Sequence, residues 1–153
     1  MTIKSLLASL LVSGAIGLSL AAAAPVLADG DGGGHNVVVT DQWGRANALG
    51  IAQDGARNRL TVTQDGFGNT TIATQDGRRN LTVVGQSGFR NTATTSQGGR
   101  CNVLGVAQLG ARNSADVEQS GACNAVGVIQ GGNGGRVTSR QGGHGNVAVI
   151  VQD

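Results

Sequence analysis

The sequence predicts an all-β fold: a two-sheet parallel β-solenoid, of the cross-β, amyloid type, made of 11-residue strand-turn units. Glutamine recurs every eleven residues without insertion or deletion, and a glycine follows two residues after almost every glutamine. Of 153 residues, 27 are Gly, whereas only two are Phe, one is Trp and none is Tyr. Large rings therefore cannot fill an ordinary globular core, and a fixed short period is typical of a stacked architecture.

The N-terminal segment, residues 1–28, is predicted to be a secretory signal peptide. Lys4 opens a short basic start, residues 6–24 are almost wholly apolar, and Val26-Leu27-Ala28 offers the small residues of a cleavage site before Asp29. A membrane anchor is the alternative, although the apolar run is marginal for a span. A short Gly-rich leader, 29–35, then precedes the repeat domain, 36–153. Export would place the two cysteines in an oxidising environment.

The repeat unit is defined by three amino-acid types at constant spacing. The glutamines are Gln42, Gln53, Gln64, Gln75, Gln86, Gln97, Gln108, Gln119, Gln130, Gln141 and Gln152. The turn glycines are Gly44, Gly55, Gly66, Gly77, Gly88, Gly99, Gly110, Gly121, Gly132 and Gly143. The asparagines are Asn36, Asn47, Asn58, Asn69, Asn80, Asn91, Asn102, Asn113, Asn124 and Asn146, with Gly135 replacing one.

Each unit is predicted to be a seven-residue strand from Asn to Gln, followed by a four-residue turn. In 47–53 the alternation of a strand places Asn47, Leu49, Ile51 and Gln53 on one face. After Gln42, charged strand residues fall only on the opposite face: Arg59, Asp116, Glu118, Arg136 and Arg140. An eleven-residue helical coiled coil is disfavoured by a Gly in every unit. The sorting of charges predicts a sheet with one buried face.

Two units form one 22-residue rung, and rungs are expected to stack about 4.8 Å apart. Buried Gln and Asn side chains are then predicted to form amide ladders along the stack. Each such hydrogen bond contributes on the order of 0.5–1.5 kcal/mol net. Leucine or valine could fill the same space, but only the amide ladder fixes the register.

The motif Gln-x-Gly-x-x-Asn-x5-Gln, as in Gln53-Asp54-Gly55-Ala56-Arg57-Asn58 through Gln64, closely resembles the curlin repeat of curli subunits, from Asn36 to Gln152. The resemblance implies a bacterial amyloid subunit, exported through the periplasm and polymerised into extracellular, cell-surface fibres. Such fibres build biofilm matrix and mediate surface adhesion and cell aggregation. The implied partners are other copies of the chain, a related nucleator or client subunit, the curli secretion pore with its accessory factors, and surfaces or host matrix.

The chain departs from the family pattern in two respects. The family's major subunit usually has a longer leader before its repeats, and members typically have ten strands. Here there are eleven candidate strands, so half a rung is left over at one end, and end-to-end stacking is expected to need rotation of successive copies. The family also suggests that turn aspartates temper polymerisation, and Asp54, Asp65 and Asp76 are the candidates here.

The two ends of the array are predicted to be the polymerisation surfaces, because unpaired strand edges template further strands and no capping segment is evident. The strand 146–152 is apolar on both faces, and 36–40 is similarly apolar. The candidate residues are Val37, Val38, Val39, Val147, Val149 and Val151. A buried terminal rung of a monomer is the alternative.

Cys101 and Cys123 are 22 residues apart in equivalent turn positions. Their Cα atoms are expected about 4.8 Å apart, within the range for a disulfide; a pair of reduced thiols is the alternative. Two stacked cysteines lack two further ligands for zinc, so no metal or cofactor is predicted. Phe67 and Phe89 align in the same way and suggest an aromatic stack on a turn edge; exposed surface packing between fibrils is the alternative.

Other functional classes are less well supported. No nucleophile–base constellation is apparent, which argues against an enzyme. Charged residues make up 13% and the net charge is +2, too little for nucleic acid binding. A monomeric ice- or surface-binding β-solenoid is an alternative suggested by outward threonines, although Leu81 and Val83 interrupt them. Major and nucleator subunits are not distinguished: regular repeats favour the former, and the irregular unit 130–140 fits the latter.

Overall fold

The computed structural model describes residues 26–28 and 34–153, and the remainder of the predicted signal peptide and leader lies outside the described residues. All the regular elements in this described part are β-strands. The first six are β1 (Val26–Ala28), β2 (Asn36–Arg45), β3 (Ala48–Gln53), β4 (Arg59–Phe67), β5 (Thr70–Arg78) and β6 (Leu81–Phe89). The rest are β7 (Thr92–Arg100), β8 (Val103–Ala111), β9 (Ser114–Ala122), β10 (Ala125–Gln130), β11 (Arg136–Gln141) and β12 (Val147–Gln152).

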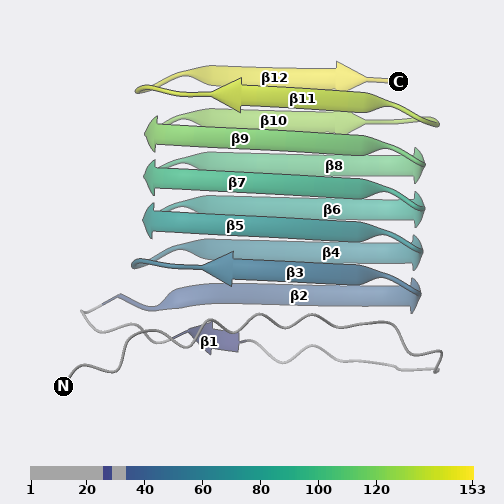
Figure 1. Ribbon diagram of the computed structural model, residues 1–153, viewed down its shortest axis with the longest axis horizontal. Helices are drawn as coiled ribbons and strands as arrows, with labels where there is room; N and C mark the ends of the chain where they lie inside the picture. Colours follow the sequence, from purple (N-terminus) through teal and green to yellow (C-terminus); the bar gives the residue numbers. More distant parts are fainter. Residues whose placement is uncertain (1–25, 29–33) are drawn as a thin grey trace.

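The strands form two stacked sheets, as the repeat predicts (Figure 1). One sheet has the order β1-β2-β4-β6-β8-β10-β12, and the other has the order β11-β9-β7-β5-β3. From β2 onward every pairing is parallel and joins residues 22 apart, so that Gln64 lies opposite Gln86 and Leu60 opposite Thr82. The predicted two-sheet β-solenoid with 22-residue rungs is therefore confirmed.

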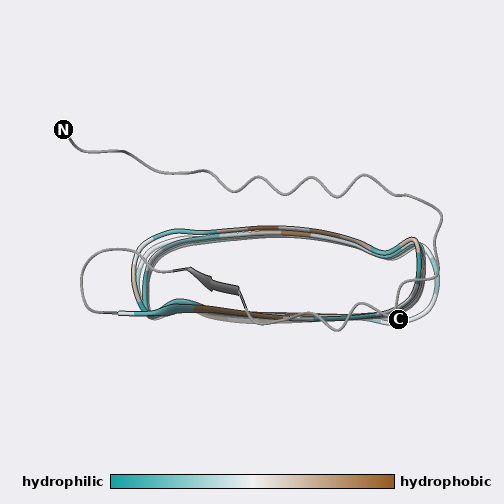
Figure 2. Ribbon diagram, turned by 90° about the horizontal axis from the view of Figure 1, so that it is seen from below, coloured by the Kyte–Doolittle hydropathy of each residue, from teal (hydrophilic) through white to brown (hydrophobic). Residues whose placement is uncertain are grey.

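The core is a thin apolar layer inside a flattened ring, seen end-on in Figure 2. Leu60, Val62, Leu104 and Val117 are completely buried between the two sheets. Buried glutamines and asparagines border this layer at the strand ends. None of the buried side chains in the described part of the chain is charged. Alternation therefore separates the inner and outer faces as the sequence predicts.

The interior strands are longer than predicted. β4 to β9 each have nine residues and continue three residues beyond the glutamine, so that only Gly68 and Asn69 separate β4 from β5. The expected four-residue turn is corrected accordingly. The reason is that turns stacked on neighbouring rungs hydrogen-bond to each other through their backbones, as in the bond from Arg90 N to Phe67 O of 2.8 Å.

β1 was not anticipated by the repeat pattern, because it lies within the predicted signal peptide. It pairs antiparallel with the start of β2, with Ala28 opposite Asn36 and Val26 opposite Val38. The first end of the array, predicted to be uncapped, is thus paired over three residues in the full chain. Among the described residues, no strand pairs with the remainder of the β2 edge.

Candidate functional site

Two glutamine ladders run the length of the solenoid. In the first sheet, Nε2 of Gln42, Gln64, Gln86, Gln108 and Gln130 each donates to Oε1 of the glutamine 22 residues later, at 2.5–3.2 Å. The second ladder joins Gln53, Gln75, Gln97, Gln119 and Gln141 at 2.6–2.9 Å. All donors point toward the C-terminal end, so the two ends of the stack differ chemically.

The glutamines also connect the two sheets across the core. Gln64 Nε2 donates to Thr71 Oγ1 at 3.1 Å, and the same hydroxyl donates to Gln86 Oε1 at 2.9 Å. In the same way, Thr82 Oγ1 accepts from Gln75 Nε2 at 3.2 Å and donates to Gln97 Oε1 at 3.0 Å. A polar residue at an inward slot was the sequence signal for these bridges. The sequence alone does not identify such a threonine as a bridge, because only the stacking of rungs brings its hydroxyl between two glutamine amides.

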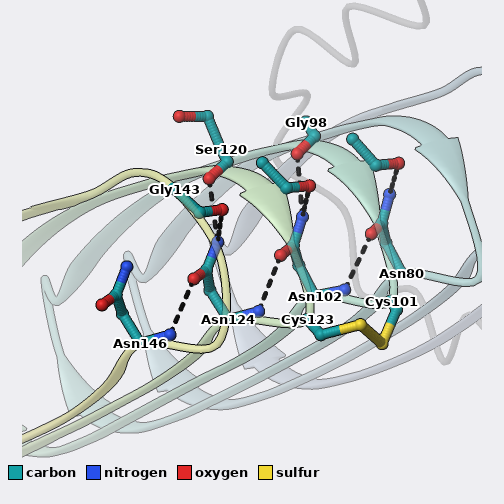
Figure 3. Close-up of a disulfide and its surroundings, with 11 residues drawn as sticks. Asn80, Gly98, Cys101, Asn102, Ser120, Cys123, Asn124, Gly143 and Asn146 are labelled. Carbon is teal, nitrogen blue, oxygen red and sulfur yellow. Dashed lines mark hydrogen bonds between the residues drawn. A yellow bond between two sulfur atoms is a disulfide. The ribbon is translucent and has the colours of Figure 1, made fainter.

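The asparagines close their own turn and hold the next rung. Asn80 Nδ2 donates to the carbonyl of Asp76 in its own turn and to that of Gly99 one rung on, both at 3.0 Å. Its Oδ1 accepts from the backbone N–H of Asn102 at 3.0 Å. Figure 3 shows this column continuing through Asn124 to Asn146. At the irregular unit the backbone N–H of Gly135 still donates to Asn113 Oδ1 at 2.9 Å, so the array continues.

The turn glycines are required by the stack as well as by the turn. All ten have positive φ, for example +111° at Gly66 and at Gly77, a region that side chains resist. A Cβ on Gly77 would also overlap the carbonyl oxygen of Gly99 in the next rung. This second constraint follows from the spacing of rungs and was absent from the sequence argument.

A second left-handed position, immediately before each asparagine, was missed. Non-glycine residues hold it at φ of 53–61°, including Arg79, Cys101 and Cys123. The signal was present in the sequence, because the same slot holds glycine at Gly68, Gly134 and Gly145. Most L-residues adopt this conformation only where surrounding structure enforces it.

The two cysteines occupy this slot on adjacent rungs. Cys101 follows β7 and Cys123 follows β9, and the two form a disulfide with their Cα atoms 4.5 Å apart (Figure 3). Both residues are exposed at the edge of the solenoid. Phe67 and Phe89 stack at the opposite edge, with ring centroids 5.5 Å apart and planes 10° apart, and the Arg90 guanidinium lies 4.8 Å from the Phe89 centroid.

The two predicted polymerisation surfaces lie at opposite ends of the stack (Figure 1). At the C-terminal end, Val147, Val149 and Val151 of β12 are 63–75% exposed, and Ala148 and Ile150 are only partly buried. At the N-terminal end, Val38 points into the core, Val37 is intermediate and Val39 is exposed. Gln53 Oε1, the first acceptor of its ladder, is buried without a hydrogen-bond partner. Such a group is expensive to leave unsatisfied.

The two outer faces of the solenoid differ. On β6, β8, β10 and β12 every outward position before the ladder glutamine is apolar or glycine. A shallow groove lies over Gly105 and Gly127, between Val83 and Ile129. The outer face of β9 and β11 is charged and carries an ion pair between Arg140 and Glu118, N to O 3.2 Å. Leu81 and Val83, which interrupt the outward threonines in the sequence, are part of this apolar face, which is recognisable only when the strands are placed side by side.

In the described part of the chain, no group of three or more His, Cys, Asp or Glu side chains is arranged to hold a metal ion. Nor do residues 26–28 and 34–153 include a helix long and apolar enough to cross a membrane.

One family of known proteins matches the chain. Residues 55–88, from the turn before β4 to the end of β6, match the family described as Curlin associated repeat. No curated protein matches the chain significantly. The matched span contains three ladder glutamines, Gln64, Gln75 and Gln86, and four turn glycines, Gly55, Gly66, Gly77 and Gly88, the first and last of which lie at its boundaries. This part of the chain is therefore similar to the curlin repeat, in agreement with the motif.

Proposed function

We propose that this curlin-repeat chain is a secreted structural subunit that polymerises end to end into extracellular amyloid fibres of a bacterial biofilm matrix. The curlin repeat and the β-solenoid fold fit a curli-type structural subunit, and the family is structural rather than enzymatic. Secretion, adhesion and cell aggregation are the finer parts of the proposal. Residues 1–28 would direct export and be removed.

The observation that carries the proposal is that the solenoid ends as unfinished rungs. The interior is held by continuous ladders and buried aliphatic residues, and among the described residues the Thr95 hydroxyl is the one buried interior side-chain group without a partner. At the ends, by contrast, the last strand is exposed, and Gln53 Oε1, the first ladder acceptor of the second sheet, is buried without a partner. Soluble solenoids cap such ends with polar outer repeats. A second copy of the chain has the same strands, glutamines and glycines at the same spacing, so it can pair with the open end of the solenoid.

Within this function, a major subunit is favoured over a nucleator. The irregular unit 130–140 is the feature of the sequence that fits a nucleator, yet within it the backbone N–H of Gly135 maintains its contact with Asn113. β11 pairs in register with β9, and β12 with β10, so the irregular sequence of this unit does not interrupt the stack. The unit therefore does not form a distinct surface that could act as a nucleator. A related subunit, a secretion pore and accessory factors would be the partners in the cell.

The test is assembly of the purified chain, followed by thioflavin fluorescence, electron microscopy and fibre diffraction. We expect unbranched fibres with a meridional spacing of about 4.8 Å. The variant Ile150→Asp places a charge on the inner face of the terminal strand and should abolish assembly. Its control, Thr74→Asp, places the same charge on an exposed outer position of β5, between the uncharged Ala52 and Ser96 of the neighbouring strands, and should assemble normally.

Other outcomes would replace the proposal. A chain that remains monomeric at high concentration would favour the ice- or surface-binding solenoid. A chain that assembles poorly alone but accelerates a related subunit from trace amounts would favour the nucleator.

A further inference from the structure

The two sheets contain unequal numbers of repeat strands. Setting β1 aside, β2, β4, β6, β8, β10 and β12 face only β3, β5, β7, β9 and β11. β12 therefore forms half a rung with nothing opposite it. A second copy stacked with each sheet continuing itself would place β2 on β12 and leave a strand-wide gap above β11. The backbone groups along that gap would be left without partners.

We propose that successive copies in the fibre are related by a half turn about the fibre axis, with β2 of one copy on β11 of the copy before it and β3 on β12. This rests on the proposed function and specifies the join between subunits. The half turn lets the next copy's β2 complete the open rung opposite β12. The eleven-residue count then continues across the join, with Asn36 of the new copy following Asn146 as the next unit.

This register completes both glutamine ladders. Residues 22 apart in the continued count are Gln141 and Gln42, and Gln152 and Gln53. Within the chain the corresponding steps, Gln119 to Gln141 and Gln130 to Gln152, measure 2.9 and 3.2 Å. Nε2 of Gln152 would thus donate to the buried Oε1 of Gln53, the acceptor that lacks a partner in the single chain.

The same register joins the incomplete parts of the core. Four hydrophobic side chains pack against the core while remaining partly exposed: Leu49, Ile51, Ala148 and Ile150. The half turn places Leu49 of the new copy on Ala148, and Ile51 on Ile150. Without rotation, Ala148 and Ile150 would meet Val38 and Thr40, whereas Leu49 and Ile51 would lie above the gap.

Charge on the outer face favours the same arrangement. Arg140 of β11 already pairs with Glu118 of β9 below it, and the half turn places the exposed Asp41 of the new copy directly above Arg140. Without rotation, Asp41 would lie opposite Val151. Opposite charges across paired strands stabilise a sheet, and a charge facing valine does not. β1 pairs only with residues 36–38 of this edge, so the join requires its displacement or removal.

Engineered disulfides distinguish the two arrangements. The native bridge shows that cysteines 22 positions apart, just before the asparagines, are close enough to bond. The half turn places Gly145 of one copy over Ala46 of the next at the same spacing, whereas unrotated stacking places Gly145 over His35. The two variants are Gly145→Cys with Ala46→Cys and, as the matched control, Gly145→Cys with His35→Cys, each with Cys101→Ser and Cys123→Ser. Both pairs lie at opposite ends of one chain, so any cross-link joins two copies.

After oxidation of preformed fibres, the Ala46 pair should give a ladder of covalent oligomers on a non-reducing denaturing gel, and the His35 pair should remain monomeric. The reverse pattern, or fibres in which neither pair cross-links, overturns the half turn while the proposed function stands. The same pairs are also prepared with Cys101 and Cys123 retained. If the native disulfide is needed for folding, these chains still allow cross-linking between copies to be measured on the gel. Failure of the wild-type chain to form fibres would instead overturn the proposed function and this join with it.

Discussion

At the scale of the residue, each repeated amino acid is determined by its copy on the next rung. A glutamine in the interior has its donor and its acceptor both engaged, so its side chain could not be replaced by an aliphatic group of similar size without orphaning its neighbours. Gln97 accepts from Gln75 at 2.8 Å and from Thr82 at 3.0 Å, and donates to Gln119 at 2.8 Å.

Gln97→Leu should lower the free energy of unfolding by about 3 kcal/mol, because it leaves buried polar groups on both neighbouring rungs without partners. Gln42→Leu, at the start of a ladder and only partly buried, should have a clearly smaller effect, since it removes a single side-chain bond. Denaturant titration of both variants measures the difference. Equal destabilisation would contradict the ladder account.

The glycine columns allow an equally direct test. Gly77→Ala should prevent correct folding, because its φ is +111° and a Cβ would overlap the Gly99 carbonyl oxygen. Gly85→Ala is the matched control, since a Cβ at Gly85 meets nothing within 4 Å. Circular dichroism and assembly kinetics compare the two. A stable, assembling Gly77→Ala chain would show that rung spacing does not enforce glycine at this position.

At the scale of the element, a strand and its turn act as one 11-residue unit, and pairing continues from the strand into the turn. The disulfide connects two such units, the turn after β7 and the turn after β9. It closes a loop of one rung, with its cysteines separated by 22 residues. A covalent link of this length restricts the unfolded chain without altering the ladder.

Reduction of the disulfide should therefore lower the free energy of unfolding by about 3 kcal/mol while the native sheet remains. Denaturant midpoints with and without reductant measure this, and the Cys101→Ser, Cys123→Ser chain, which should not respond to reductant, is the control. An unchanged midpoint for the wild-type chain would mean that the bridge contributes nothing to stability.

At the scale of the whole molecule, the solenoid has a direction. Every glutamine donor points toward β12, and the end at β2 and β3 presents acceptors. The two ends are therefore complementary to each other and not to themselves, which favours one open-ended, head-to-tail polymer.

Two separately blocked chains test this complementarity. Ile51→Asp should block the β3 end and Ile150→Asp the β12 end, so each variant alone should remain monomeric because a buried charge would be left at the join. An equimolar mixture should form dimers through the two intact ends and stop there, as measured by size-exclusion chromatography with light scattering. Continued fibre growth in the mixture would show that these ends do not form the join.

An uninterrupted eleven-residue period leaves one register for every strand, so the strand unit, the two-sheet stack, the inward face and the pairs of residues 22 apart follow from the sequence alone. It also placed Cys101 close to Cys123. The three-dimensional structure was needed to show how far pairing extends into the turns, which hydroxyl connects Gln64 and Gln86, and why Gly77 must be a glycine next to Gly99. These depend on distances between neighbouring rungs. The continuous apolar outer face and the pairing of β1 with β2 likewise emerged only in three dimensions, because they join segments that the period alone does not relate.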